Sequence, residues 1–331
     1  MIRRWNKVRE KIVEVKNLKK YFYTKKGLLG KRVPIVAVDD VSFDIFKGET
    51  LGLVGESGCG KSTLGRVIVK LYEPTEGSIK FKNRDISSLS KSELKAIKKE
   101  MQIIFQDPYS SLNPRLNVNT IVGEALLTHN LVNKGEDYNN KVEEIIEKCG
   151  LATYQINRYP HQFSGGQRQR IGLARALALN PDFIVADEPV SALDVSIQSQ
   201  MLNLMNDLKR DFGLSYLFIS HDLSVVKHIS DRIAVMYLGI IVELANKKDI
   251  YNKPLHPYTR ALISAVPEPN PKKIKELAAI KGEIPSNTDV PKGCRFHTRC
   301  PYAKEICTQE VPIYREIESN HFVACHFAGE I

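Results

Sequence analysis

The sequence has no long apolar run. A helix that spans a bilayer needs roughly 20 consecutive apolar residues, whereas the longest apolar stretches here are short, strand-like pieces such as 184–186 and 217–219. The N-terminal segment MIRRWNKVREKIVEV is charged and lacks the apolar core of a secretory signal. We therefore expect a chain that neither spans the membrane nor is exported.

The sequence also lacks a concentrated basic region. Its formal net charge is +10, yet the lysines and arginines are spread along the whole chain, with only short clusters at 95–99 and 272–275. A dispersed excess of this kind favours a solvated surface near anionic lipid over a nucleic-acid site. We expect no nucleic-acid partner.

The hydrophobic pattern predicts an α/β protein. Apolar strands alternate with amphipathic helices in the second half of the core, and this alternation is typical of a largely parallel sheet. The predicted strands there are 183–186, 214–220, 232–237 and 239–244, and the predicted helices are 195–210 and 222–229. Two earlier segments, 12–18 and 33–46, show the alternation of β-strands.

Two further regions differ in texture from this core. Residues 107–170 are mostly helical in pattern and predict an inserted helical subdomain. Beyond about residue 253 prolines become frequent, and four of the six cysteines lie in the last 38 residues. We therefore divide the chain into a core domain, 1–253, and a small cysteine-rich C-terminal extension, 254–331.

Residues 55–62 read GESGCGKS and match G-x-x-x-x-G-K-[ST] at every fixed position. The glycines let consecutive backbone N–H groups face a phosphate, and the helix that starts near Lys61 presents its positive end to the same anion. Lys61 adds a point charge, and Ser62 offers a hydroxyl to Mg²⁺. Cys59 is read as a small filler. The residues expected to contact the nucleotide here are Gly55, Ser57, Gly58, Cys59, Gly60, Lys61, Ser62 and Thr63.

A second motif completes a metal–nucleotide site. Residues 182–188, DFIVADE, form an apolar strand that ends in two acids. Asp187 is expected to hold Mg²⁺, and Glu188 to polarise the water that attacks the γ-phosphorus. The two motifs together predict a P-loop nucleoside triphosphatase.

The stretch FSGGQRQR at 163–170 selects among P-loop proteins. It resembles the signature L-S-G-G-Q of the ABC ATPases, with Phe163 in place of the usual leucine, and the resemblance covers roughly 10–250. It implies a RecA-like core, an antiparallel β subdomain and an inserted helical subdomain. It also implies that Gln106 is the coupling glutamine and a Mg²⁺ ligand, that 191–194 form the D-loop, and that His221 contacts the γ-phosphate.

The same resemblance implies how ATP is enclosed. Phe22 stands where the family has an aromatic residue that stacks on adenine, with Tyr21 or Tyr23 as alternatives. Ser164, Gly165 and Gly166 open a helix, an anion-binding arrangement. In a head-to-tail dimer they close on the ATP of a second subunit. The catalytic set is then Glu188, His221 and Gln106.

The extension carries a motif of its own. HPYTR at 256–260 resembles the C-terminal extension of oligopeptide and dipeptide importer ATPases. From residue chemistry alone, Cys294, Cys300, Cys307 and Cys325 suit a [4Fe–4S] cluster, zinc or free thiols, with His297 and His326 as further zinc ligands. The resemblance implies the [4Fe–4S] cluster, with zinc less favoured.

We therefore expect the Mg²⁺-dependent ATPase of a peptide importer at the cytoplasmic face of the membrane. The alternative cargo is nickel or an oligosaccharide. Expected partners are a second, unlike ATPase, two permeases and an extracytoplasmic peptide-binding protein; the wording SGGQRQR favours the second ATPase of such a pair. A DNA-repair or translation ABC protein is disfavoured because the chain has one phosphate loop and no long heptad run.

Overall fold

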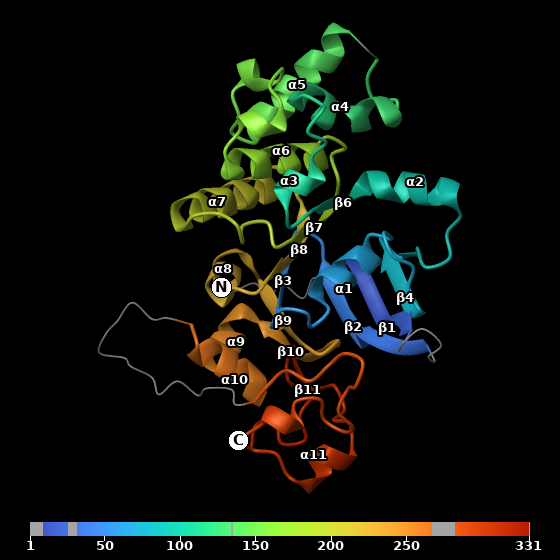
Figure 1. Ribbon diagram of the computed structural model, residues 1–331, viewed down its shortest axis with the longest axis vertical. Coiled ribbons are helices and arrows are strands. Elements are labelled where there is room, and N and C mark those ends of the chain that lie inside the picture. Colours follow the sequence, from blue (N-terminus) through green and yellow to red (C-terminus); the bar gives the residue numbers. More distant parts are fainter. Residues whose placement is uncertain (1–8, 26–31, 134, 267–281, 331) are drawn as a thin grey trace, which may run out of the picture.

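The computed structural model describes residues 9–25, 32–133, 135–266 and 282–330. Figure 1 shows these parts stacked along one axis: a group of helices at one end, two sheets in the middle, and the C-terminal residues at the other end. The described residues contain no helix that is both long enough and apolar enough to cross a bilayer.

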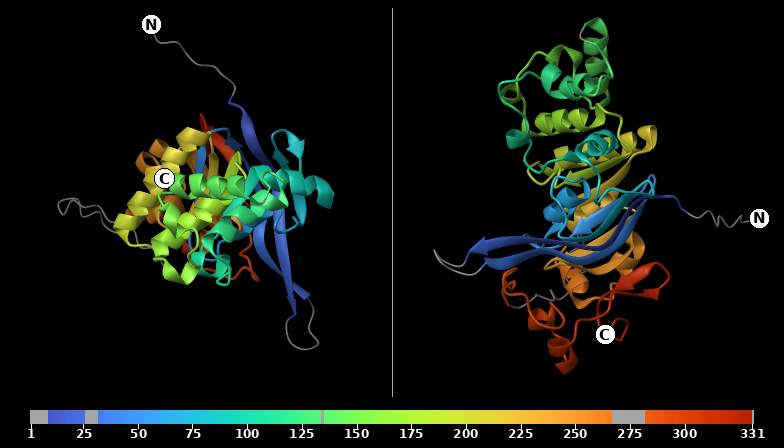
Figure 2. Two further views of the ribbon diagram at one scale, coloured as in Figure 1. Left: turned by 90° about the horizontal axis from the view of Figure 1, so that it is seen from above. Right: turned by 90° about the vertical axis from the view of Figure 1, so that its right-hand side faces the viewer.

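The first part of the chain forms most of a four-stranded antiparallel sheet. Its strand order is β2-β1-β4-β5, and the strands are β1 Lys11–Lys25, β2 Arg32–Phe46, β4 Glu76–Phe81 and β5 Arg84–Asp85. Apolar residues of this sheet, among them Val13, Ile45 and Phe81, are buried in a core that they share with the second, larger sheet. The far ends of β1 and β2 project from the molecule as a ribbon (Figure 2).

The larger sheet has eight strands in the order β11-β12-β10-β9-β3-β8-β7-β6. The strands are β3 Thr50–Val54, β6 Met101–Ile104, β7 Phe183–Asp187, β8 Ser215–Ser220, β9 Arg232–Tyr237, β10 Ile240–Asn246, β11 Arg315–Glu318 and β12 His321–Val323. The strands from β9 to β6 pair in parallel, and β3, β7, β8 and β9 are buried along their whole length. Continuous apolar runs suit such strands because both faces are covered.

Helices cover this sheet and build the far end of the molecule. They are α1 Lys61–Ile68, α2 Lys91–Glu100, α3 Pro108–Ser111, α4 Val118–Thr128, α5 Glu136–Lys148, α6 Gly165–Leu177, α7 Val195–Phe212, α8 Leu223–Ile229, α9 Lys247–Asn252, α10 Pro257–Ser264 and α11 Glu305–Gln309, with short 3-10 turns η1 Thr153–Gln155, η2 Pro160–Gln162 and η3 His297–Arg299. Helix α6 contacts α3, α4 and α5. The predicted α/β fold is confirmed. The segment 107–170 contains α3, α4, α5, η1, η2 and the start of α6.

The C-terminal extension packs into the core. Strand β12 pairs with β10, placing Val323 opposite Glu243, so the last hairpin continues the large sheet. The ring of Tyr258 lies 4.8 Å from that of Tyr237 and 5.4 Å from that of Phe296, measured between centroids. Residues after 253 therefore share an apolar core with the preceding part of the chain, although the sequence texture changes near residue 253.

Candidate functional site

The phosphate loop joins β3 to α1 and needs glycine at two places. Gly55 and Gly60 have φ angles of 155° and 109°. A Cβ at Gly55 would lie 2.2 Å from the carbonyl oxygen of Met236, and one at Gly60 would lie 2.0 Å from that of Ala37. Real Cβ atoms do not approach backbone oxygens so closely, so close packing as well as backbone conformation requires glycine.

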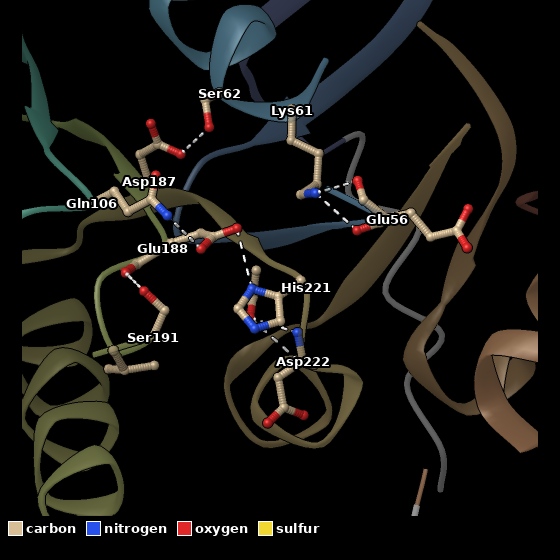
Figure 3. Close-up of polar contacts among 12 residues, drawn as sticks. Glu56, Lys61, Ser62, Gln106, Asp187, Glu188, Ser191, His221 and Asp222 are labelled. Carbon is tan, nitrogen blue, oxygen red and sulfur yellow. Dashed lines mark hydrogen bonds and ion pairs between the residues drawn. The ribbon is translucent and has the colours of Figure 1, made fainter. Parts of the chain in front are cut away.

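Lys61 points into this loop. Its Nζ donates hydrogen bonds to the carbonyl oxygens of Gly55 at 2.8 Å and Glu56 at 2.9 Å, as Figure 3 shows. The side chain is buried. The ammonium group is thus held inside the loop, with two backbone acceptors that a phosphate oxygen can replace. The Cys59 thiol lies 3.8 Å from the same Nζ, and burial raises its pKa.

Ser62 and Asp187 meet across the mouth of the loop. The Ser62 hydroxyl donates to Oδ1 of Asp187 at 2.7 Å, and Arg66 lies 3.6 Å from Oδ2. Asp187 is 1% exposed, and its Oδ2 has no hydrogen-bond partner among the described atoms. Burial raises the pKa of this carboxyl. A hydroxyl beside a carboxylate with an unused buried oxygen fits Mg²⁺, which prefers oxygen ligands.

Glu188 follows directly at the end of β7 and is the centre of a small network (Figure 3). Its Oε2 accepts a hydrogen bond from the Gln106 side chain at 2.9 Å, and its Oε1 lies 3.2 Å from Nδ1 of His221. The backbone N–H of Glu188 donates to Ile219 of β8 at 3.0 Å. The Ser191 hydroxyl donates to the Glu188 carbonyl at 3.1 Å. Three residues predicted as catalytic therefore come together around one carboxylate.

Asp187 and His221 contact Ser62 and Glu188 but do not themselves line the pocket that Ser62 and Glu188 share above the loop. This pocket is lined by Phe22, Ile35, Ala37, Ser57, Gly58, Gly60, Lys61, Ser62, Thr63, Gln106, Glu188 and Asn287. Among the aromatic candidates, Phe22 lines the pocket, whereas the Tyr21 hydroxyl donates to Asp39 and Tyr23 is 60% exposed. The Phe22 ring is braced edge-on by Tyr72, with 5.6 Å between centroids.

The signature segment, 163–170, lies outside this pocket. Ser164 caps α6: its hydroxyl accepts the N–H of Gln167 at 3.3 Å, and the Gln167 side chain accepts the N–H of Ser164 at 3.0 Å. Ser164 and Gly165 are exposed. Within the described part of the chain, no signature residue lines the phosphate pocket. The open N-terminus of α6 is therefore free to face another molecule.

The four C-terminal cysteines line one small cavity, whose wall also includes Phe296, Phe327 and His256. Burial raises the pKa of the Cys294 thiol to about 12. The two histidines considered as zinc ligands are engaged with the backbone: Nδ1 of His297 lies 2.8 Å from the Cys294 carbonyl, and Nε2 of His326 lies 3.0 Å from that of Glu310.

The expectation of a metal centre is not supported by this geometry. Across the residues described, no group of three or more His, Cys, Asp or Glu side chains is arranged to hold a metal ion. The four cysteines do line one cavity together. Their spacing in the chain identified which residues meet, but not how their sulfur atoms are disposed.

Four residues at the site were not predicted from the sequence: Arg66, Tyr258, Asn287 and Arg299. Arg66 follows the phosphate loop by one helical turn, a position that could have indicated it. Tyr258 stood inside the HPYTR motif, without an assigned role. Asn287 and Arg299 belong to loops of the extension and carry no motif that signals contact with a loop more than 200 residues earlier.

Comparison with known proteins decides the family. The ABC transporter family model matches residues 38–191, and the model for the oligopeptide/dipeptide transporter C-terminal region matches 242–307. The chain is 56% identical over 321 residues to the oligopeptide transport ATP-binding protein AppF of Bacillus subtilis (strain 168), covering 96% of this chain and 97% of AppF. This chain belongs to the ATP-binding proteins of oligopeptide ABC transporters. It is an ABC-type ATPase.

Other members of this family and solved ABC cassettes agree. The oligopeptide transport ATP-binding protein OppF of the same bacterium is 49% identical over 317 residues, covering 96% of each chain. A solved dimer of the ATP-binding cassette MJ0796, bound to ADP and Pi, matches with a TM-score of 0.64 and 30% identity. It covers 71% of this chain and 98% of the cassette.

Proposed function

We propose that this protein couples hydrolysis of Mg²⁺-bound ATP to the import of di- and oligopeptides. The observation that carries the proposal is the contact of Glu188 with Gln106 and His221 beside the phosphate loop, in a chain that also has the oligopeptide-type C-terminal region. The relatives named as oligopeptide transport proteins support the same cargo class.

Binding begins at the phosphate loop. The Lys61 ammonium exchanges its two carbonyl acceptors for β- and γ-phosphate oxygens, while the loop N–H groups and the N-terminus of α1 contact the phosphates. Phe22 stacks on adenine. Ser62 and Asp187 would hold Mg²⁺, with Gln106 as a further ligand, and the ion would neutralise charge that develops on the phosphates.

Hydrolysis requires a positioned water. Glu188 accepts a proton from this water as its oxygen attacks the γ-phosphorus, and the bond from that phosphorus to the bridging oxygen breaks, leaving ADP and phosphate. His221 lies against one carboxylate oxygen and also reaches the γ-phosphate. Gln106 holds the other oxygen, so a change of partner at its side chain would move the segment after β6 that carries it. That displacement is the signal passed to the membrane subunits.

A second ATPase subunit closes the site. The exposed start of α6 at Ser164 and Gly165 suits a γ-phosphate bound in a partner, because the cap leaves the first N–H groups of the helix unused. We propose a head-to-tail heterodimer that contacts two permeases at the cytoplasmic face of the membrane and receives peptides through an extracytoplasmic binding protein.

Uptake in the native host tests the proposed cargo. Deleting the gene should abolish uptake of a radiolabelled tri- or pentapeptide, and the wild-type gene should restore it. Lys61→Ala should not restore uptake because the loop loses its charge. Lys47→Ala, an exposed lysine outside the site, is the matched control and should restore it fully.

Parallel measurements decide between cargoes. Uptake of ⁶³Ni²⁺ and of an oligosaccharide should be unchanged in the deletion strain. Loss of nickel uptake with intact peptide uptake would contradict the peptide proposal and leave the ATPase centre unaffected.

We infer that the cysteine cavity holds a [4Fe–4S] cluster. The proposal rests on the donor set alone: four cysteines from separate segments line one cavity, and four thiolates are the usual ligands of such a cluster. As the described side chains are placed, they form no metal-binding group. The cluster would be structural. It would join η3, α11 and the segment after β12.

Anaerobic purification tests this. The protein should be brown and contain about four irons per chain. Cys307→Ser should lose the iron, whereas Cys149→Ser, a buried cysteine in the helical part, should keep it. One zinc per chain, or no metal at all, would contradict the cluster.

A further inference from the structure

The C-terminal extension touches the phosphate loop at three points. Arg299 donates to both carboxylate oxygens of Glu56, from Nη1 to Oε2 at 2.7 Å and from Nη2 to Oε1 at 3.0 Å. The Tyr258 hydroxyl accepts the backbone N–H of Glu56 at 3.0 Å. Asn287 donates from Nδ2 to the carbonyl oxygen of Gly58 at 3.0 Å. Three side chains of the extension thus hold a loop segment of three residues.

Glu56 occupies a variable position of the phosphate-loop motif, so binding phosphate does not require this acid. Its carboxylate points away from Lys61 (Figure 3). The Arg299 side chain is only 5% exposed, and its paired position beside Glu56 and the Tyr237 hydroxyl raises the guanidinium pKa. The Glu56 side chain is 23% exposed, so the pair is partly buried. A two-bonded arginine–carboxylate pair of this kind restricts both partners more than an exposed ion pair does.

The extension also reaches the nucleotide pocket itself. Asn287 is one of its lining residues. The backbone carbonyl of Asn287 accepts the N–H of Val36 at 2.9 Å, so the segment is tied to β2 beside the pocket wall formed by Ile35 and Ala37. The side chain is therefore held between the phosphate loop and the four-stranded sheet.

We propose that Arg299 and Asn287 are positioning residues of the ATP site: the extension holds the phosphate loop in its phosphate-binding shape. A loop that is already ordered binds ATP more tightly, because no binding free energy is used to order it. Arg299 lies in the turn between Cys294 and Cys300, so the segment that lines the cysteine cavity also sets the loop. The inference rests on ATP binding at the phosphate loop and not on the cargo.

The test is equilibrium binding of Mg²⁺-ATP to the full chain, with KM and kcat measured in the assembled transporter. Arg299→Met and Glu56→Gln should each weaken ATP binding about tenfold, as expected for loss of a partly buried charged pair. The double variant should be no weaker than the worse single variant, because the two residues act as one unit. KM should rise while kcat changes little, and Arg299→Lys should recover part of the affinity.

Two further variants keep the test decisive. Asn287→Ala removes a half-buried side chain at the pocket edge and should weaken ATP binding a few-fold, even if Arg299→Met folds poorly. Arg84→Met is the control. It breaks an exposed ion pair outside the site, in which the Arg84 guanidinium lies 2.7 Å from the Glu93 carboxylate, and this variant should bind ATP normally.

The outcomes separate this inference from the proposed function. Wild-type protein that binds no Mg²⁺-ATP would remove the ATP site altogether. Wild-type protein that binds ATP, with Arg299→Met and Asn287→Ala binding it equally well, would overturn the inference alone. A fall in melting temperature with unchanged KM would assign the pair a structural role and would also overturn it.

Discussion

At the residue scale, the ATP site depends on unusual backbone conformations at a few positions and on the space around them. Gly60 precedes α1 in a left-handed conformation, with the Ala37 carbonyl filling the space of a side chain. Glu188 is a non-glycine residue with a φ of 48°, yet it carries the central carboxylate. A strained backbone conformation persists only when surrounding contacts hold it. Here the hydrogen bonds from the Glu188 N–H to the Ile219 carbonyl and from the Ser191 hydroxyl to the Glu188 carbonyl hold it.

Replacing Gly60 with alanine should abolish ATP binding and cost about 3 kcal/mol of unfolding free energy, since both the φ angle and the contact with Ala37 are forbidden to a Cβ. Denaturant unfolding and ATP binding measure the two effects. Gly172→Ala in α6 is the control, because a Cβ added there would meet no other atom within 4 Å; it should be neutral or slightly stabilising. Normal ATP affinity in the Gly60 variant would contradict the loop geometry.

At the element scale, two helices begin with the same device but serve different purposes. Ser90 caps α2 through a capping box with Glu93, and Ser164 caps α6 through one with Gln167. Helix α2 crosses from the antiparallel sheet to β6, whereas α6 begins in the signature. The caps are equivalent for stability, so a difference in activity reports on the signature alone.

Ser90→Ala and Ser164→Ala should each cost about 1 kcal/mol of stability, the usual value of a serine cap. Only Ser164→Ala should reduce ATP turnover in the assembled transporter, because only this hydroxyl faces the second subunit's phosphate in the proposed dimer. Chemical denaturation and steady-state ATPase assays compare them. Equal activity of the two variants would argue against a role for Ser164 beyond capping.

At the scale of the whole molecule, the two halves of an ATP site lie apart. The phosphate loop opens at the carboxyl ends of β3 and β7, and the signature lies at the start of α6, toward the helical end of the chain (Figure 1). In the proposed dimer, one chain would supply a loop to one site and a signature to another. In the proposed dimer, both sites are completed only by a second ATPase subunit in the opposite orientation.

Glu188→Gln should slow ATP hydrolysis at least about a hundredfold, because an amide cannot take the proton of the attacking water, while ATP binding persists. The variant should remain associated with its partner ATPase in Mg²⁺-ATP and dissociate when Mg²⁺ is removed. Size-exclusion chromatography with light scattering measures the association. Undiminished turnover would show that Glu188 is not the base.

Much of this protein was predictable because its motifs are local. The run from Leu51 to Ser62 contains an apolar strand, the glycines and the charge that a phosphate loop needs in consecutive positions. The structure has the buried strand β3 there and confirms the helix that starts at Lys61. The strand ending at Asp187 was recognisable for the same reason. Neighbouring parallel strands bring their carboxyl ends to one edge, so the meeting of these motifs followed from the fold class.

Only the tertiary structure decided how the extension meets the ATP site. Arg299 and Glu56 are 243 residues apart, and neither the arginine between two cysteines nor the acid at a variable loop position indicates the other. Their pairing depends on β12 joining β10 and on Tyr258 packing between Tyr237 and Phe296. Local sequence determines which backbone shapes a segment can adopt; the burial of apolar surface among distant segments determines which side chains those shapes bring together.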